Sequence, residues 1–171
     1  MPSPFQKPDL ASLALQLING TQAPKTLPTP RRIRILFKGV YIADTCSSSS
    51  STGKFVWEHP HYPYYYLPSS AFPVPPSGNS NNPDKSDVQW KLLKDVKQSD
   101  KANGNSAKSK EKDTVARIWQ LTVLDKSTDR ILEFVHGGPD GSLAGLVRFE
   151  FSAAGKPYCS SPPHSLHPSS H

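Results

Sequence analysis

The sequence predicts a mostly β protein, built as a small antiparallel folded sheet or barrel with one N-terminal amphipathic helix. Two observations support this fold class. Short runs such as 32–37 and 115–123 alternate in side-chain character, which is the period of a half-buried strand. Turn sequences such as Lys38-Gly39 separate the runs, and Pro-, Ser- or charge-rich stretches between them predict long disordered insertions.

Composition divides the 171 residues into a lead, a domain and a tail. Residues 1–29 contain the helix and a Pro-rich lead. Residues 30–152 are expected to form a single β domain, interrupted at about 73–113 by a disordered charged linker. Residues 153–171 form a Ser/Pro/His tail that we also expect to be disordered. About 100 residues then remain for the core, enough for one small domain.

The helix is predicted over residues 10–19. Asp9 is a suitable N-cap, and Gly20 supplies a C-terminal stop. Because a helix this short is not stable alone, its apolar side must dock on the domain. The apolar residues at helical spacing are Leu10, Leu13, Ala14, Leu17 and Ile18.

The first half of the domain is predicted to begin with a hairpin around Lys38-Gly39. Its first strand places Ile33, Ile35 and Phe37 on one face. The strands predicted in this half are 32–37, 40–45, 55–58 and 64–67.

The second half begins with a segment of ambiguous period. Its apolar residues, between Val88 and Val96, fit either a short helix or a short strand, and both alternatives remain open. From Val115 the alternation typical of strands is clear. The expected elements are a strand at 115–123, a turn at 125–129, and strands at 130–135 and 143–151. In the last strand, Val147, Phe149 and Phe151 lie opposite Leu146, Arg148 and Glu150.

The segment from Phe55 to Pro68 carries the strongest indication of a site. It combines one indole, four phenols, two imidazoles and one carboxylate with three prolines. Proline excludes a helix here, so we expect a stiff extended ribbon that forms a ligand-binding wall on a concave face. The predicted wall consists of Trp57, His59, Tyr62 and Tyr65, with Arg34 assisting if the ligand is anionic.

Glu58 is the candidate catalytic residue, as a general acid or base. Burial beside aromatic side chains would raise the pKa of this carboxyl group into a useful range. The alternative is a structural ion pair between Glu58 and an arginine of the first strand. The tyrosines equally suit ordinary sheet packing, and Arg34 equally suits a solubilised strand edge.

Composition also argues against several classes of partner. His59 and His61 lack further ligands at metal spacing, so no metal site is predicted. Whether the protein uses a cofactor is left unknown by the sequence. The net charge of +6 is spread along the chain, so nucleic acid is not the expected partner. No apolar run approaches the roughly 20 residues that span a bilayer. Without a signal peptide, and with Cys46 and Cys159 as isolated thiols, we expect a cytoplasmic or nuclear protein.

Three blocks of the sequence carry a resemblance to a known family. They are residues 31–45, residues 56–60 with the tyrosines that follow, and residues 143–151. Together they resemble the family catalogued as domain of unknown function 427, in particular its fungal members, which also carry the leucine-rich helix. The resemblance implies a compact, tent-like β fold and no established activity. The family's nominal nucleotidyltransferase label would require a nucleotide-cradling turn and paired carboxylates for a divalent metal, which this sequence lacks.

Two features depart from the family pattern. Bacterial members carry a Cys-Pro-Tyr-Lys-Gly-like element where this chain has the charged linker, so no site residue is carried over there. Members also continue past the last strand into an acidic, Trp-containing segment, whereas Gly155-Lys156 here opens the Ser/Pro/His tail. We hypothesise that residues after about Ala154 are translated intron or a misread gene model, which sequencing the transcript across that junction would test.

Three hypotheses of function follow. The leading one is a β domain that binds a compact polar ligand on its aromatic face, with Glu58 as acid or base. The second is a non-catalytic protein-interaction module that uses helix 10–19 or the linker. The third is single-stranded nucleic-acid binding through aromatic rings and arginines.

Overall fold

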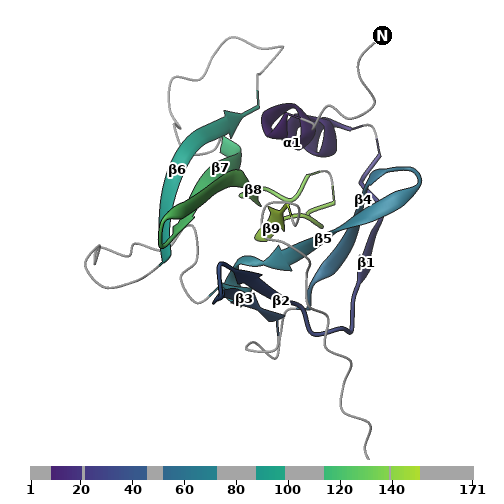
Figure 1. Cartoon of the computed structure of the whole chain (residues 1–171). Helices are drawn as coiled ribbons and strands as arrows, with labels where there is room; N and C mark the ends of the chain where they lie inside the picture. The colour runs from purple at the N-terminus through teal and green to yellow at the C-terminus, as the bar shows by residue number, and fades with distance from the viewer. Residues whose placement is uncertain are drawn as a thin grey trace, which may run out of the picture.

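The computed structural model describes residues 9–20, 22–45, 52–72, 88–98, 114–138 and 140–150. These residues form one α-helix, a seven-stranded antiparallel sheet and a separate two-stranded sheet (Figure 1). The predicted mostly β fold class is confirmed. Within the described ranges the large sheet is open, with β1 and β6 at its edges, so the folded sheet rather than the barrel is the form found.

The elements have the following bounds. The helix α1 spans Leu10–Asn19, and a 3-10 turn, η2, spans Ser69–Ala71. The strands are β1 (Thr26–Pro28), β2 (Arg34–Phe37), β3 (Val40–Asp44), β4 (Lys54–His59), β5 (Tyr62–Pro68), β6 (Val88–Lys97), β7 (Thr114–Val123), β8 (Lys126–Phe134) and β9 (Leu146–Phe149).

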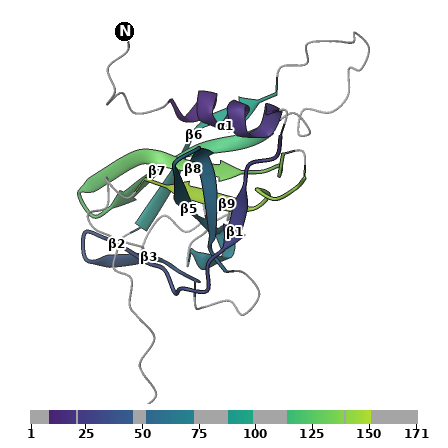
Figure 2. The same ribbon diagram turned by 90° about the vertical axis from the view of Figure 1, so that its right-hand side faces the viewer.

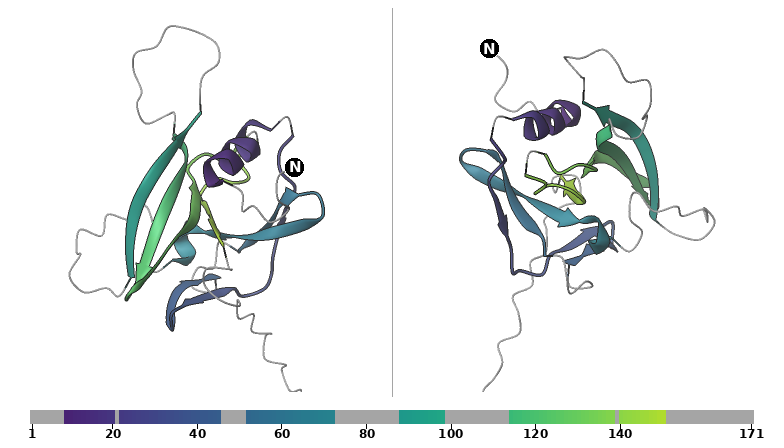
Figure 3. Two further views of the ribbon diagram at one scale, coloured as in Figure 1. Left: turned by 45° about the horizontal axis from the view of Figure 1, so that its top comes forward. Right: turned by 180° about the vertical axis from the view of Figure 1, so that it is seen from behind.

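The large sheet consists of two halves that meet at β9. Its strand order is β1-β4-β5-β9-β8-β7-β6, so β9 pairs with β5 on one side and β8 on the other. Figures 1 and 3 show the halves diverging on either side of β9, with α1 above the fold between them. All four residues of β9 are buried, because a central strand in this fold is covered on both faces.

The helix covers one face of the sheet. Asp9 caps it by accepting a hydrogen bond from the backbone N–H of Ser12 at 3.0 Å, and this bond lowers the pKa of the Asp9 carboxyl. The predicted apolar positions of the helix are buried in what we call the helix-side core. This core also contains Val56, Tyr66, Val96, Val115, Ala116, Leu132, Phe134, Leu143 and Leu146. The predicted helix is therefore present, with its apolar side docked on the sheet.

The β2–β3 hairpin covers the opposite face (Figure 2). Its turn has positive φ at both central residues, 53° at Lys38 and 85° at Gly39, which matches the twist of the strands. Ile33, Ile35 and Phe37 are buried as predicted. They belong to what we call the hairpin-side core, with Ile42, Ala43, Leu67, Ala71, Phe72, Trp119, Leu121, Val123, Ile131, Val147 and Phe149.

Several local predictions need correction. The segment 55–68 is not one extended ribbon, because the chain reverses at Pro60-His61 to form the β4–β5 hairpin. The predicted turn at 125–129 lies at Leu124-Asp125 instead. The segment of ambiguous period is the strand β6, which pairs with β7 as a sheet edge. The rest of the predicted linker, and the tail at 153–171, lie outside the described residues.

Candidate functional site

The β4–β5 hairpin divides the predicted site between two faces of the sheet. Side chains alternate along a strand, so neighbours such as Trp57 and Glu58 point to opposite sides. Val56, directly opposite Tyr64 on β5, belongs to the helix-side core. Phe55 is directly opposite Tyr65, which packs against the hairpin-side core. The acid and most of the predicted aromatic wall therefore have different surroundings.

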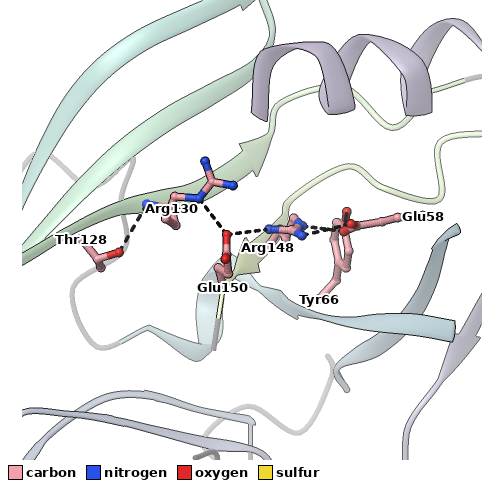
Figure 4. A network of polar contacts seen from close by, with 6 residues as sticks. All are labelled: Glu58, Tyr66, Thr128, Arg130, Arg148 and Glu150. Carbon is pink, nitrogen blue, oxygen red and sulfur yellow. Dashed lines mark hydrogen bonds and ion pairs between the residues drawn. The ribbon is translucent and has the colours of Figure 1, made fainter. Parts of the chain in front are cut away.

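Glu58 makes a buried ion pair with Arg148 of β9 (Figure 4). The Arg148 Nε donates to Glu58 Oε1 at 2.5 Å, and its Nη2 donates to Oε2 at 3.0 Å. The Tyr66 hydroxyl donates to the same Oε1 at 2.7 Å. The side chains are almost inaccessible, at 2% exposure for Arg148 and 5% for Glu58. Both carboxylate oxygens are thus occupied by donors.

The ion pair extends into a longer polar network across the sheet (Figure 4). Arg148 stacks over Tyr64, with its guanidinium carbon 4.7 Å from the ring centroid. Its Nη1 lies 3.9 Å from Glu150, which accepts a hydrogen bond from Arg130 Nε at 2.7 Å. Among the described residues Nη1 has no hydrogen-bond partner, although it is buried. The network therefore runs from the Glu58 carboxylate to the partly exposed Arg130.

The network favours one protonation state each for Tyr66 and Arg148. Burial, and then the negative charge of Glu58, raise the pKa of the Tyr66 hydroxyl well above its ordinary value, so this phenol stays neutral and donates. Burial opposes the charge of Arg148, but the hydrogen bonds and charge of Glu58 outweigh it and raise its pKa. Glu58 thus forms a structural ion pair, as the alternative interpretation expected. Its partner comes from β9, whereas that interpretation named an arginine of the first strand.

The other face of the hairpin carries a cluster of rings, which we call the aromatic face: Phe55, Trp57 and Tyr65. The Phe55 ring centroid lies 4.7 Å from that of Tyr65 and 6.5 Å from that of Trp57. All three side chains are half-buried. The Nζ of Lys25, next to the edge strand β1, sits 4.6 Å from the Trp57 ring centroid. This arrangement is a cation–π contact on a partly exposed aromatic surface.

The remaining predicted site residues lie apart from these rings. His59 is exposed at the hairpin turn, where its ring centroid is 5.0 Å from that of His61. Arg34 lies on the outer side of the β2–β3 hairpin, bonded to Asp44 and 5.8 Å from the Tyr41 ring centroid. The side chain of Tyr62 is outside the described part of the structure. Of the predicted wall residues, the structure thus brings only Trp57 and Tyr65 together among the described side chains, with Phe55 between them.

Sequence reasoning missed Phe55, Lys25 and Arg148 as site residues. Strand alternation could have linked Phe55 to Trp57, since they are two apart on one strand. The nearly continuous apolar run around Arg148 is typical of a strand buried on both faces, and it could have indicated that this arginine needs a partner. Lys25 lies in the Pro-rich lead, where no such signal exists.

The described residues contain neither a candidate metal site nor a candidate membrane-spanning helix. No group of three or more histidine, cysteine, aspartate or glutamate side chains there is placed to hold a metal ion. Nor does that part of the chain contain a helix with the length and apolar character that a bilayer crossing requires.

The protein is thus an antiparallel β protein, in which the β4–β5 hairpin carries a buried ionic network on one face and a half-exposed aromatic cluster on the other. The family described as Domain of unknown function (DUF427) matches residues 25–91, which run from Lys25 through the aromatic face into β6. No curated protein and no solved structure matches the chain. The match thus agrees with the resemblance found in the sequence and covers the whole β4–β5 hairpin.

Proposed function

We propose that this protein binds a compact, flat, negatively charged ligand on the aromatic face. The observation that carries this proposal is the contact between the half-buried rings of Phe55, Trp57 and Tyr65, with the Lys25 ammonium 4.6 Å from the indole centroid. Flat ligand rings stack on such aromatic surfaces, and the stacking depends little on which substituents the ligand ring carries.

Phe55 and Trp57 are not needed to fill the interior. Among the described residues, neither belongs to the helix-side core or the hairpin-side core. Large aromatic side chains normally dominate cores, so adjacent rings left half-exposed on one sheet face favour a binding role. The exposed Leu27 of β1, directly opposite Phe55, extends this surface.

Lys25 gives the surface its preference for anions. Its ammonium is held against Trp57, whose backbone N–H also donates to the Lys25 carbonyl at 3.0 Å. A flat ligand that stacks on the indole would meet this ammonium, so a carboxylate or phosphate on the ligand would gain an ion pair.

Glu58 has a positioning role in this proposal. Its oxygens already accept hydrogen bonds from Arg148 and Tyr66, which leaves it poorly suited to proton transfer. By fixing β4 to β9, it holds the adjacent Trp57 in place on the opposite face. We therefore propose binding without an acid–base step.

We also infer that the chain is a member of the DUF427 family. The match over residues 25–91 supports this inference, as does the similar block at 143–151, which lies beyond the matched range. Membership adds no activity to the proposal, because the family description names none.

The test is a titration of the wild-type protein with aromatic carboxylates and mononucleotides, followed by tryptophan fluorescence and thermal shift. We expect Trp57→Ala to weaken binding about tenfold or more, since one stacked ring contributes about 1–3 kcal/mol. Tyr41→Ala, which removes an exposed ring on the β2–β3 hairpin, is the matched control and should bind normally. Equal affinity of wild type and Trp57→Ala, or no binding of any compound, would contradict the proposal.

A further inference from the structure

The β2–β3 hairpin exposes apolar side chains on the side that faces away from the sheet. Leu36 and Tyr41 are directly opposite each other across the two strands. Leu36 is 42% exposed and Tyr41 is 58% exposed, whereas Ile35 and Phe37 on the other side are buried. We call the surface formed by Arg34, Leu36, Tyr41 and Asp44 the hairpin outer face.

The hairpin segment that carries this outer face is positively charged, and its arginines are held in place. Residues 31–45 contain four basic side chains (Arg31, Arg32, Arg34 and Lys38) and one acid (Asp44), a net charge of 4 − 1 = +3. Arg32 donates to Asp44 through Nε at 2.9 Å and Nη2 at 2.7 Å, and Arg34 donates through Nε at 3.2 Å. Arg34 also lies against the Tyr41 ring. The fixed side chains lose little conformational entropy when a partner binds.

The hairpin also offers main-chain groups to an extended partner. Among the described residues, β2 and β3 pair only with each other, so each strand has an outer edge. An extended peptide can add to such an edge through backbone hydrogen bonds, while neighbouring side chains determine which peptide binds. Tyrosine and arginine, which flank the edge here, are enriched at the energetic centres of protein interfaces.

We propose that the hairpin outer face docks an extended acidic segment of a partner protein. The net charge of +3 over residues 31–45 favours acidic side chains in the partner, and the Leu36–Tyr41 pair provides an apolar contact between them. A second copy of this chain would bring the same positive charge and be repelled. A nucleic acid would satisfy the arginines, but its phosphate backbone has no apolar side chain to place on Leu36.

The test measures fluorescence anisotropy of a labelled short peptide of alternating Glu and Val on the full chain. We expect binding by the wild type and about tenfold weaker binding by Tyr41→Ala, as is usual for an interface centre. Lys38→Glu should weaken binding as well, because it reverses one positive charge in the turn of the hairpin. Leu93→Ala removes a comparable side chain, 44% exposed on β6, and should leave binding unchanged. The thermal midpoints of the variants show whether each is folded.

Four results would overturn the proposal. They are no binding of the acidic peptide, equal binding by wild type and Tyr41→Ala, equal binding of a Lys–Val peptide, and binding of an oligothymidine that depends on Tyr41 as strongly as peptide binding does. The last result would identify a nucleic-acid surface instead. Trp57→Ala should retain peptide binding, so failure here is separable from failure of the ligand proposal.

Discussion

Two carboxylates in this protein each hold an arginine through two hydrogen bonds, yet their surroundings differ. Glu58 and Arg148 have side-chain exposures of 5% and 2%. Asp44 and Arg32 have exposures of 22% and 38%. The first pair joins strands 90 positions apart in the sequence, whereas the second joins residues 12 apart in one hairpin. Similar contacts should therefore have very different energetic weight.

The difference arises from what remains when one partner is removed. A buried arginine without its carboxylate keeps a charge that water cannot reach, so the loss is large even where the intact pair contributes little net stability. An exposed arginine without its carboxylate is simply hydrated, and salt already screens the exposed pair.

The largest effect is expected from Glu58→Gln. This change leaves the Arg148 charge uncompensated in the interior and should lower the free energy of unfolding by about 3–5 kcal/mol. Urea denaturation at neutral pH, followed by circular dichroism, measures the change. A loss below about 1 kcal/mol, which is typical of surface ion pairs, would show that water reaches Arg148 in solution.

A double replacement sharpens this result. In Glu58→Leu with Arg148→Met, both charges are absent and apolar side chains fill similar space, so much of the lost stability should return. If the double variant is as unstable as Glu58→Gln, packing rather than an unpaired charge explains the loss.

An intermediate effect is expected from Tyr66→Phe. The variant lacks the hydrogen bond to the Glu58 carboxylate at 2.7 Å, and the loss should be about 1.5–3 kcal/mol at neutral pH. Burial and Glu58 raise the pKa of Tyr66, so above about pH 10 the unfolded chain releases this proton before the folded protein does. The wild type therefore loses stability as the pH rises through that range, and Tyr66→Phe should lose less.

Urea denaturation at neutral and alkaline pH gives both parts of this result. Tyr41→Phe is the matched control, because it removes the hydroxyl of an exposed ring. The alkaline decline of this variant should match that of the wild type. Parallel alkaline declines in wild type and Tyr66→Phe would mean that other groups account for the pH dependence.

The smallest effect is expected from Asp44→Asn. The two arginines that pair with Asp44 are 31–38% exposed, so the free energy of unfolding should fall by no more than about 1 kcal/mol. Added salt should reduce the difference in stability between this variant and the wild type. The same denaturation assay at low and high salt measures it. A loss equal to that of Glu58→Gln would remove the distinction between the two pairs.

The elements that the sequence predicts well are those with local signals. Asp9 and the leucine spacing define the helix, and Lys38-Gly39 defines a hairpin, because caps and tight turns depend on a few neighbouring residues. The β6 strand remained ambiguous because its exposed face and the irregular register between Leu92 and Lys94 weaken the alternation.

The candidate site was predictable only in part. Trp57 and Tyr65 were named, but Glu58 was placed beside them, although one residue along a strand changes the face. Its partner Arg148 could not be located, because pairing between β5 and β9 depends on the whole sheet and no local pattern specifies it. Lys25 was missed for the same reason, since its position over Trp57 follows from the pairing of β1 with β4.

The place of β9 has a consequence for synthesis. Among the strands of the described residues, β9 comes last in the sequence, yet it lies between β5 and β8. A nascent polypeptide leaves the ribosome from its N-terminus, so β5 and β8 emerge with unpaired edges and Glu58 emerges before its cation. A premature stop ahead of Leu146 would leave two half-sheets without the strand that pairs with both, and such a product should depend on chaperones and be degraded quickly.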